Sequence, residues 1–194
     1  MLMEWLEQID QDFVLTINGI HNPWLDEFMW IVSGKFTLLP LYFLLLYAIW
    51  RKTNTKFLWQ FILITVITVL VVDQLSVYAF KETFQRYRPS HNVYLADKLH
   101  FYTSAEGEEY RGGKFGFVSS HAANMMALLT LIFPIFRNDK VWVKGSLIGV
   151  TLLVMFSRIY LGVHYLSDIL FGALLGFFIA FFVAKFTISK FLNQ

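Results

Sequence analysis

The chain has 194 residues, of which 57% are hydrophobic and only 15% are charged. Soluble domains usually carry about 25% charged residues, so this composition favours a membrane protein built as one domain, residues 1–194. The net charge of +2 argues against a nucleic-acid partner, and the absence of cysteine excludes disulfides and thiolate metal sites. The acidic start lacks the basic region and the cleavage site of a secretory signal, so we expect no cleavable signal.

Residues 1–23 predict an amphipathic helix that lies on the membrane surface. Apolar residues recur there at helical spacing while acidic residues occupy other faces, a pattern typical of an interfacial helix. A helix packed on a partner protein is the alternative. The apolar positions are Leu2, Trp5, Leu6, Ile9, Phe13 and Ile17, and the acidic positions are Glu4, Glu7, Asp10 and Asp12.

Five apolar runs follow, and we expect each of them to form a spanning helix. A helix needs about 20 residues to cross a hydrocarbon core about 30 Å thick. The first run can be extended back to Phe28, and the last run can be extended forward because lysines there can reach the interface. A soluble helical core is the alternative, but soluble helices are seldom apolar on every face. The runs are 36–50, 57–80, 117–136, 141–160 and 169–184. The predicted fold class is therefore an all-α membrane bundle of about five spans plus the N-terminal interfacial helix.

Basic residues predict the orientation of this bundle. They occur between the first and second spans, between the third and fourth spans, and after the fifth span, which are three sites on one side of the membrane. The positive-inside rule makes that side cytoplasmic. We therefore expect an integral membrane protein whose C-terminus is cytoplasmic and whose segment 81–117 faces outward; the location that we expect is a bacterial inner membrane. The basic residues are Arg51, Lys52, Lys56, Arg137, Lys140, Lys144, Lys185 and Lys190.

Two clusters of polar residues are predicted on the outward side. Lys81 and Arg88 are seven residues apart, about two helical turns, so both can face one point. Snorkelling to the interface is the alternative for either cation. Ser119 and Ser120 stand where the third span begins, and serine is a favoured N-cap. Because the start of a helix attracts anions, this start and His121 in its first turn are candidates for an anion site.

A third cluster joins the fourth and fifth spans. Arg158 closes the fourth span, and His164 and Asp168 share a helix face if the fifth helix begins between them. A carboxylate on one imidazole nitrogen fixes the tautomer and leaves the other nitrogen free for nucleophilic attack; a purely structural pair is the alternative. Ionisable residues cost about 2.5–3.5 kcal/mol each at mid-bilayer and tend to be functional there. Together the three clusters predict a site for a phosphate-like anion.

The three clusters resemble the signature of the type 2 phosphatidic acid phosphatases, the PAP2 superfamily. That signature reads K-x6-R-P, then P-S-G-H, then S-R-x5-H-x3-D. The first and third parts match at every position, whereas Val118 and Ser120 replace the proline and the glycine of the second part. Members often have six spans, so this chain would have the interfacial helix in place of the first. The matching residues are Lys81, Arg88, Pro89, Ser119, His121, Ser157, Arg158, His164 and Asp168.

The resemblance implies a phosphatase that works through a phosphohistidine and needs no metal and no other cofactor. His164 would attack the phosphorus while Asp168 orients its ring, and His121 would protonate the leaving oxygen. The segment 81–117 would cover the site as a lid. The histidines form no H-E-x-x-H pair, in keeping with metal-free chemistry. The residues expected to bind phosphate are Lys81, Arg88, Arg158, Ser119 and Ser120.

The expected substrate is a lipid phosphate in the bilayer. Among PAP2 substrates we place undecaprenyl diphosphate or a related isoprenoid diphosphate first, phosphatidylglycerophosphate or phosphatidic acid second, and lipid A third. A non-enzymatic protein that binds anionic lipid is one alternative, although it would not need His164 and Asp168 in register. A serine hydrolase using Ser119 or Ser157 is another, but neither serine lies in G-x-S-x-G. The sequence leaves the oligomeric state open.

Overall fold

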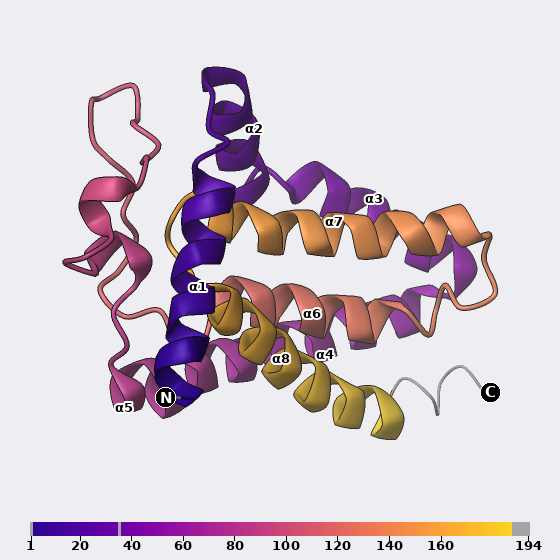
Figure 1. The fold of residues 1–194 in the computed structure, drawn as a ribbon. Helices are drawn as coiled ribbons and strands as arrows, with labels where there is room; N and C mark the ends of the chain where they lie inside the picture. The colour runs from indigo at the N-terminus through magenta and orange to yellow at the C-terminus, as the bar shows by residue number, and fades with distance from the viewer. Residues whose placement is uncertain (1, 35, 188–194) are drawn as a thin grey trace.

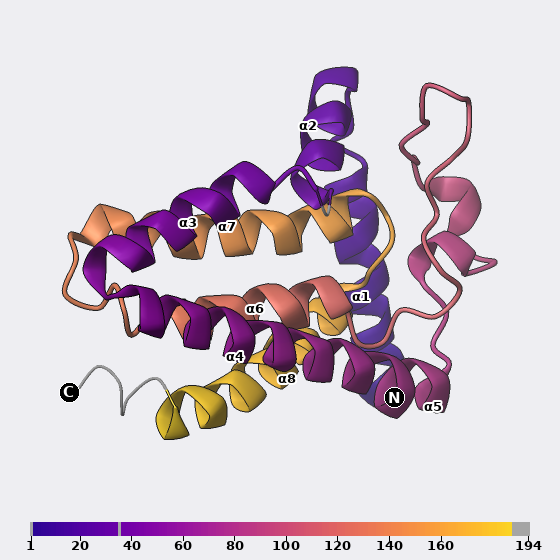
Figure 2. The ribbon, with the colours of Figure 1, turned by 180° about the vertical axis from the view of Figure 1, so that it is seen from behind.

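The computed structural model describes residues 2–34 and 36–187, and these residues are almost entirely helical. Apart from two isolated β-bridges, none of them belongs to a strand. The longer helices form a bundle that places its connections at two opposite ends (Figures 1 and 2). The elements are α1 (Leu2–Asn18), α2 (Pro23–Ser33), α3 (Leu39–Lys52), α4 (Thr55–Gln74), the π-helix η1 (Leu75–Lys81), α5 (Glu82–Phe84), the 3-10 turns η2 (Pro89–His91) and η3 (Ala96–Lys98), α6 (Ser120–Ile132), α7 (Val141–Tyr160) and α8 (Leu166–Phe186).

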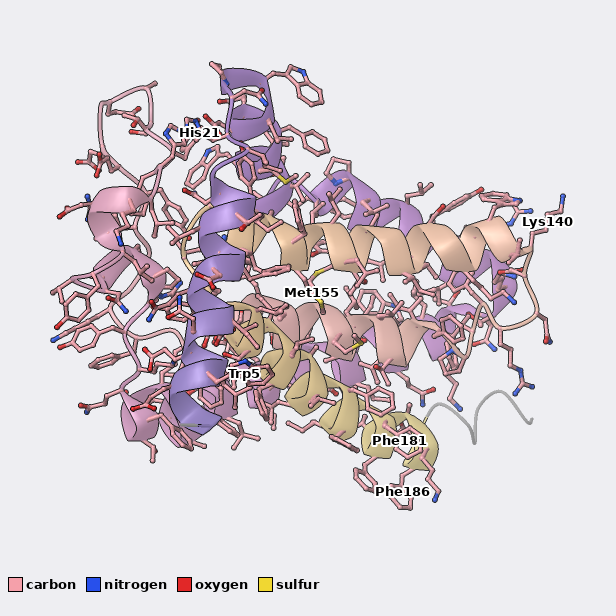
Figure 3. All side chains as sticks on the ribbon, in the orientation of Figure 1. Trp5, His21, Lys140, Met155, Phe181 and Phe186 are labelled. Atoms are coloured by element: carbon pink, nitrogen blue, oxygen red, sulfur yellow. The ribbon has the colours of Figure 1, made fainter. Side chains whose placement is uncertain are left out.

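Three of the described helical segments are long and apolar enough to cross a membrane. They are the continuous segment Thr55–Phe84, which joins α4, η1 and α5, and the helices α7 and α8. Their outer faces are apolar, and Figure 3 shows Phe181 and Phe186 projecting from α8 away from the bundle. The prediction of a helical membrane bundle is confirmed by this architecture.

The other two predicted spans are shorter helices than we expected. The first run does not extend back to Phe28, because the chain leaves its helix at Gly34 and a new helix, α3, begins only at Leu39. The third run yields α6, whose 13 residues measure about 20 Å at 1.5 Å per residue. Phe133 caps the helix and Pro134 comes next; because proline has no N–H to donate and its ring clashes with the preceding turn, α6 stops there.

Helix α6 lies at the centre of the bundle and packs against α4, α7 and α8. Small residues allow the closest approach. A Cβ atom added to Gly172 of α8 would lie 2.5 Å from the carbonyl oxygen of Ser119, and one added to Gly176 would clash with the carbonyl oxygen of Ala123. The start of α6 is therefore held against the first turns of α8.

Helix α1 crosses one end of the bundle at a steep angle (Figures 1 and 2). It presents three faces. The first, with Asp10, Val14 and Asn18, is buried against the protein, the second is apolar and exposed, and the third is polar and exposed. Asp10 does lie on a face other than the exposed apolar one, as expected, but this face is buried, because Asp10 forms hydrogen bonds with Arg86 and Ser167. The exposed apolar residues are Trp5, Leu6, Ile9 and Phe13.

The connections with the predicted basic residues lie at one end of the bundle. The connections that follow α3 and α6 meet at one end, where Lys52 Nζ lies 2.6 Å from Asp139 Oδ1. Figure 3 shows Lys140 at this end and His21 at the other, beside the loop 85–119. The predicted basic connections therefore lie away from that loop. Lys190, which also entered the prediction of orientation, lies outside the described residues.

Candidate active site

The three sequence clusters meet around one cavity of about 610 Å³. It lies between α2, α3, the α4–η1 segment, α6 and the end of α7, and the loop 85–119 forms part of its wall. Ser119 and Asp168 are fully buried and do not line it. The predicted site residues that line the cavity are Lys81, Arg88, Ser120, His121, Arg158 and His164.

His164 is held between a carboxylate and a guanidinium. Its Nδ1 lies 3.3 Å from Asp168 Oδ2, and its Nε2 lies 3.1 Å from Arg88 Nη1. Because a guanidinium only donates hydrogen bonds, Nε2 accepts here and the ring proton lies on Nδ1, where it faces Asp168. The helix α8 does begin between the two residues, at Leu166. Their four-residue spacing therefore brings Asp168 to Nδ1, and Nε2 carries the lone pair.

Burial sets the protonation state of His164. Burial first, and the positive charge of Arg88 second, hold the pKa of His164 well below its ordinary value. Burial also lowers the pKa of Arg88, to about 10, so Arg88 stays charged at pH 7. The site therefore combines a neutral imidazole with a permanent cation, and this combination suits attack on an anion.

The loop 85–119 positions Arg88. The guanidinium donates to the carbonyl oxygens of Phe115 (3.1 Å) and Val163 (3.3 Å). Gly112 has a φ of +66°, and a Cβ atom there would lie 2.9 Å from Arg88 Nη1. Glycine is needed because other residues rarely adopt this conformation and because the guanidinium fills the space. We had expected Arg88 two turns along the helix from Lys81, but Gln85 adopts a left-handed conformation and ends the helix at Phe84.

Arg158 and Lys81 reach the cavity from two other elements. Arg158 donates to Ser33 Oγ at the end of α2 and to the Tyr110 hydroxyl in the loop (2.7 Å). Its Nε is buried and has no hydrogen-bond partner among the described residues, so one donor remains for a ligand. Lys81 Nζ donates to Ser120 Oγ at 2.6 Å. Ser120, which departs from the family glycine, thus contributes a hydroxyl beside this cation.

The second cluster forms a capped helix start, as predicted. Ser119 is the N-cap of α6 and its hydroxyl accepts from the N–H of Ala122 at 3.5 Å. The N–H of Ser119 donates to the carbonyl oxygen of Asp168 at 3.0 Å. Ser119 therefore ties α6 to α8 from behind the cavity, whereas Ser120 and His121 face it.

Sequence reasoning missed a second support for Asp168. Arg86 donates to Asp168 Oδ1 (3.1 Å) and to Asp10 Oδ2 (2.9 Å). Its guanidinium also lies over the ring of Tyr165, 4.2 Å from the ring centroid. Asp10 in turn accepts from the N–H of Ser167 at 2.9 Å. This network connects α1 to the start of α8. Two features of the sequence could have pointed to this network. One is Arg86, two positions before Arg88, and the other is Asp10, which shares the helical spacing of the buried residues of α1.

Comparison with known proteins places these residues in a family. The sequence profile of the PAP2 superfamily matches residues 57–191, a range that contains all three clusters. The chain belongs to the PAP2 superfamily. It is therefore an enzyme of the PAP2 phosphatase type, and a membrane protein that acts on lipid phosphates. This assignment excludes both the non-enzymatic and the serine-hydrolase alternatives.

Two curated relatives align with nearly the whole chain. A lipid A 4'-phosphatase of Porphyromonas gingivalis is 36% identical over 184 residues, which are 94% of this chain and 75% of the relative. A lipid A 4'-phosphatase of Bacteroides thetaiotaomicron is 32% identical over 178 residues, which are 91% of this chain and 76% of the relative.

Solved structures share the fold. One is a transmembrane PAP2-type phosphatidylglycerolphosphate phosphatase from Bacillus subtilis, with a TM-score of 0.66, 24% identity, and coverage of 95% of this chain and 87% of the other. Another is LpxE of Aquifex aeolicus, with a TM-score of 0.62, 21% identity, and coverage of 91% and 94%. At these identities the likeness supports the PAP2 membrane fold.

Proposed function

We propose that this chain is a lipid A 4'-phosphatase that works through a phosphohistidine on His164. The choice of substrate rests on one observation. Over more than nine tenths of its length, the chain is 36% and 32% identical to two enzymes of that name. We had placed undecaprenyl diphosphate first and lipid A third from the sequence. Neither curated relative is named for an isoprenoid diphosphate, so lipid A takes first place.

The chemistry follows from the surroundings of His164. The lone pair of Nε2 attacks the phosphorus, and the bond to the sugar oxygen breaks as His121 donates a proton to that oxygen. Asp168 holds the Nδ1 proton and stabilises the positive charge that the ring acquires. A water molecule then attacks the phosphorus of the phosphohistidine and gives a proton to His121. This step releases inorganic phosphate and regenerates neutral His164.

The cations hold the oxygens of the phosphate throughout. Arg88 already lies on the side of Nε2, so an arriving phosphate oxygen replaces that nitrogen as the acceptor of its hydrogen bond and frees the lone pair. Arg158 contributes its unpartnered Nε. Lys81 contributes its ammonium, beside the hydroxyl of Ser120. These fixed donors favour the extra negative charge of the transition state, and the metal-free mechanism rests on them.

Two apolar grooves beside the cavity support a substrate with several acyl chains. One, of about 410 Å³, lies between α3, α4 and α6, and the other, of about 450 Å³, lies between α3, α6 and α7. Tyr42 and Met125 line both grooves and also the catalytic cavity. Chains that hang from one headgroup can therefore enter on both sides of α3, whereas a single isoprenoid chain would fill one side.

The surroundings also support an outward-facing site at the membrane surface. The cavity lies at the end of the bundle away from the basic connections, which the positive-inside rule places in the cytoplasm. Helix α1 would lie along the outer interface, with its apolar face toward lipid and its polar face toward water. We propose an inner-membrane location on these grounds, with the loop 85–119 as the cover of the site.

A substrate panel tests this function. Purified protein in lipid nanodiscs is assayed for phosphate release from lipid A, undecaprenyl diphosphate and phosphatidylglycerophosphate, with His164→Ala as the control. The proposal expects the highest kcat/KM for lipid A and no release by the variant. A higher kcat/KM for undecaprenyl diphosphate would overturn the substrate but leave the chemistry intact. Turnover by His164→Ala would overturn the chemistry.

A further inference from the structure

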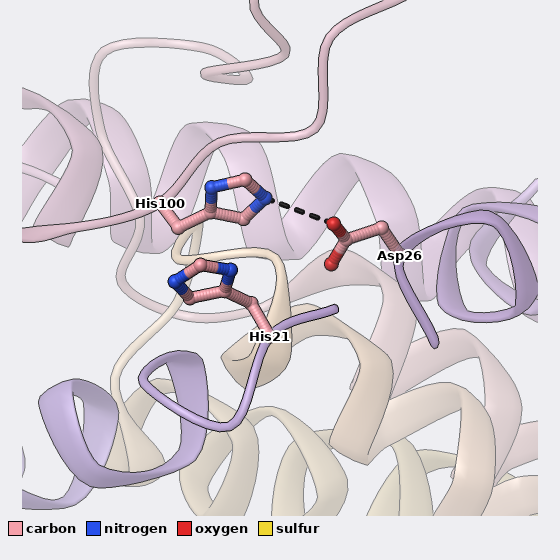
Figure 4. Close-up of side chains that lie close together, drawn as sticks. All are labelled: His21, Asp26 and His100. Atoms are coloured by element: carbon pink, nitrogen blue, oxygen red, sulfur yellow. Dashed lines mark hydrogen bonds and ion pairs between the residues drawn. The ribbon is translucent and has the colours of Figure 1, made fainter. Parts of the chain in front are cut away.

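The loop end of the molecule carries a second cluster of potential ligands. His21 lies in the turn between α1 and α2, Asp26 lies in the first turn of α2, and His100 lies in the loop 85–119. Each offers one ligand atom, and these atoms all lie within 4.8 Å of one another. None of the three residues lines the catalytic cavity. Figure 4 shows the two imidazole rings stacked, with the carboxylate of Asp26 beside their edges.

Two of these residues are held in place by buried neighbours. The backbone N–H and carbonyl oxygen of His100 each make a 2.8 Å hydrogen bond to the side chain of Asn18. The Tyr160 hydroxyl donates to Asp26 Oδ1 at 2.5 Å. This leaves Asp26 Oδ2 facing His100 Nε2, at 2.9 Å. Partners that orient a ligand from behind are typical of metal sites.

The two histidines place their imidazole rings side by side. The rings of His21 and His100 are stacked, with centroids 3.9 Å apart and planes 11° apart. A histidine binds a metal ion through a ring nitrogen that carries a lone pair. Within residues 2–34 and 36–187, no hydrogen bond engages a ring nitrogen of His21. That side chain is exposed and can turn toward an ion.

We propose that His21, Asp26 and His100 bind a divalent transition-metal ion, for which zinc is the best match. Two imidazoles and one carboxylate are a common zinc ligand set, with bonds of about 2.0–2.2 Å and water in the fourth position. Ligand atoms at tetrahedral angles would then lie about 3.4 Å apart. The 2.9 Å between His100 Nε2 and Asp26 Oδ2 needs only a small expansion to admit the ion. Calcium and magnesium prefer ligand sets made only of oxygen.

Such an ion connects three segments, and two of them, α2 and the loop 85–119, also support the active site. It ties the α1–α2 turn, α2 and the loop 85–119 to one point. The same helix and the same loop carry Ser33 and Tyr110, which hold Arg158. Because the ion binds the folded arrangement and not the dispersed segments of an unfolded chain, it raises the stability of the protein.

Zinc titration of the metal-free, untagged full-length protein tests the site. Isothermal calorimetry should give one zinc ion per chain in the wild type, with a rise in melting temperature. The affinity should fall at least about 10-fold in His21→Ala and in Asp26→Asn, since the loss of a supporting partner alone costs about 10- to 100-fold. His21 is exposed, so its replacement spares the fold.

His91→Ala is the matched control, because this histidine lies in the same loop but outside the cluster. Its zinc affinity should equal that of the wild type. Bound cobalt(II) should show the strong visible absorption of a tetrahedral site in the wild type and in His91→Ala, and should lose it in His21→Ala. No saturable zinc binding in the wild type would overturn the proposal. Wild-type affinity in His21→Ala, or an equal loss in His91→Ala, would do the same.

Discussion

At the scale of single residues, the orientation of His164 depends on a chain of contacts that begins in α1. Asp168 contacts the imidazole through one carboxylate oxygen and Arg86 through the other. Arg86 is in turn held by Asp10. Neither Arg86 nor Asp10 lines the cavity, so both are positioning residues for the nucleophile. Their effect should appear in the chemical step and not in substrate binding.

Replacement of Arg86 by alanine should lower kcat while KM stays within about twofold. A hydrogen bond to a charged group is worth about 1.5–3 kcal/mol, and 1.36 kcal/mol is tenfold in rate, so we expect a loss of about 10- to 100-fold. Arg86→Lys should recover part of it, and Lys98→Ala, an exposed cation of the same loop, should have no effect. The check is steady-state kinetics on lipid A. A rise in KM at unchanged kcat would show that Arg86 acts on binding instead.

The protonation of His164 gives a second residue-scale prediction. Since burial and Arg88 hold its pKa well below the ordinary value, the ring should remain neutral when the pH falls through 6.5, the ordinary pKa of histidine. The unfolded chain binds this proton more readily, so the contribution of His164 to stability is complete above pH 6.5 and is lost as the pH falls toward the native pKa. NMR of histidine-labelled protein, with His164→Gln for assignment, measures the titration. A midpoint at or above 6.5 would refute the prediction.

At the scale of elements, the active site depends on how closely α6 approaches α8. Gly172 allows this contact, because a Cβ atom there would lie 2.5 Å from the carbonyl oxygen of Ser119. Helix α6 carries His121 and helix α8 carries Asp168. A side-chain atom added at Gly172 would therefore push α6 away from α8 and disturb both the packing and the catalytic residues.

Gly172→Ala should destabilise the protein by about 1–3 kcal/mol, the usual cost of overpacking, and should reduce activity. Gly149→Ala in α7 is the matched control, since nothing lies within 4 Å of a Cβ atom there. As alanine favours helix over glycine by about 1 kcal/mol, the control should be as stable as the wild type or more stable. Thermal unfolding in detergent checks both variants. Equal melting temperatures for the two would argue against the close contact.

The elements also show what the sequence could and could not predict. The helices α7 and α8 were predicted within a few residues, because each is a long apolar run that ends at a polar turn. The helix of the first run is shorter than expected because the chain leaves its helical path at Gly34, before α3 begins. The helix of the third run is shorter because Pro134 lies just beyond the end of α6. Lys81 and Arg88 do not share a helical face because the left-handed Gln85 ends the helix at Phe84, between the two residues. Local backbone changes of this kind have no periodicity from which to predict them.

Site residues were predictable where a motif fixed their spacing, and not elsewhere. The cavity unites Lys81, Arg88, His121, Arg158 and His164 as expected. Supporting residues such as Ser33 and Tyr110 are distant in the sequence from the residues that they hold. The metal-site candidates are likewise spread from position 21 to position 100, so only the folded structure brings them together.

At the scale of the whole molecule, we expect the end of the bundle that carries the loop 85–119 to face outward. The natural sequence has no cysteine, so single cysteines can report on it without background. Tyr94→Cys, at an exposed position of the loop 85–119, should react in intact spheroplasts with a maleimide that cannot cross membranes. Lys140→Cys, at the opposite end, should react only after permeabilisation. The reverse pattern would place the active site in the cytoplasm and contradict the proposed orientation.

The central claim is that His164 carries the phosphoryl group during turnover. The most direct measurement is rapid quenching at alkaline pH during turnover of lipid A labelled with ³²P at the 4'-phosphate, followed by peptide mapping. Phosphohistidine is stable to base and labile to acid, so the account predicts a base-stable, acid-labile label on the peptide that contains His164. That label should be absent from His164→Ala. A label on another residue, or phosphate release by the wild type without a labelled enzyme at any quench time, would contradict the account.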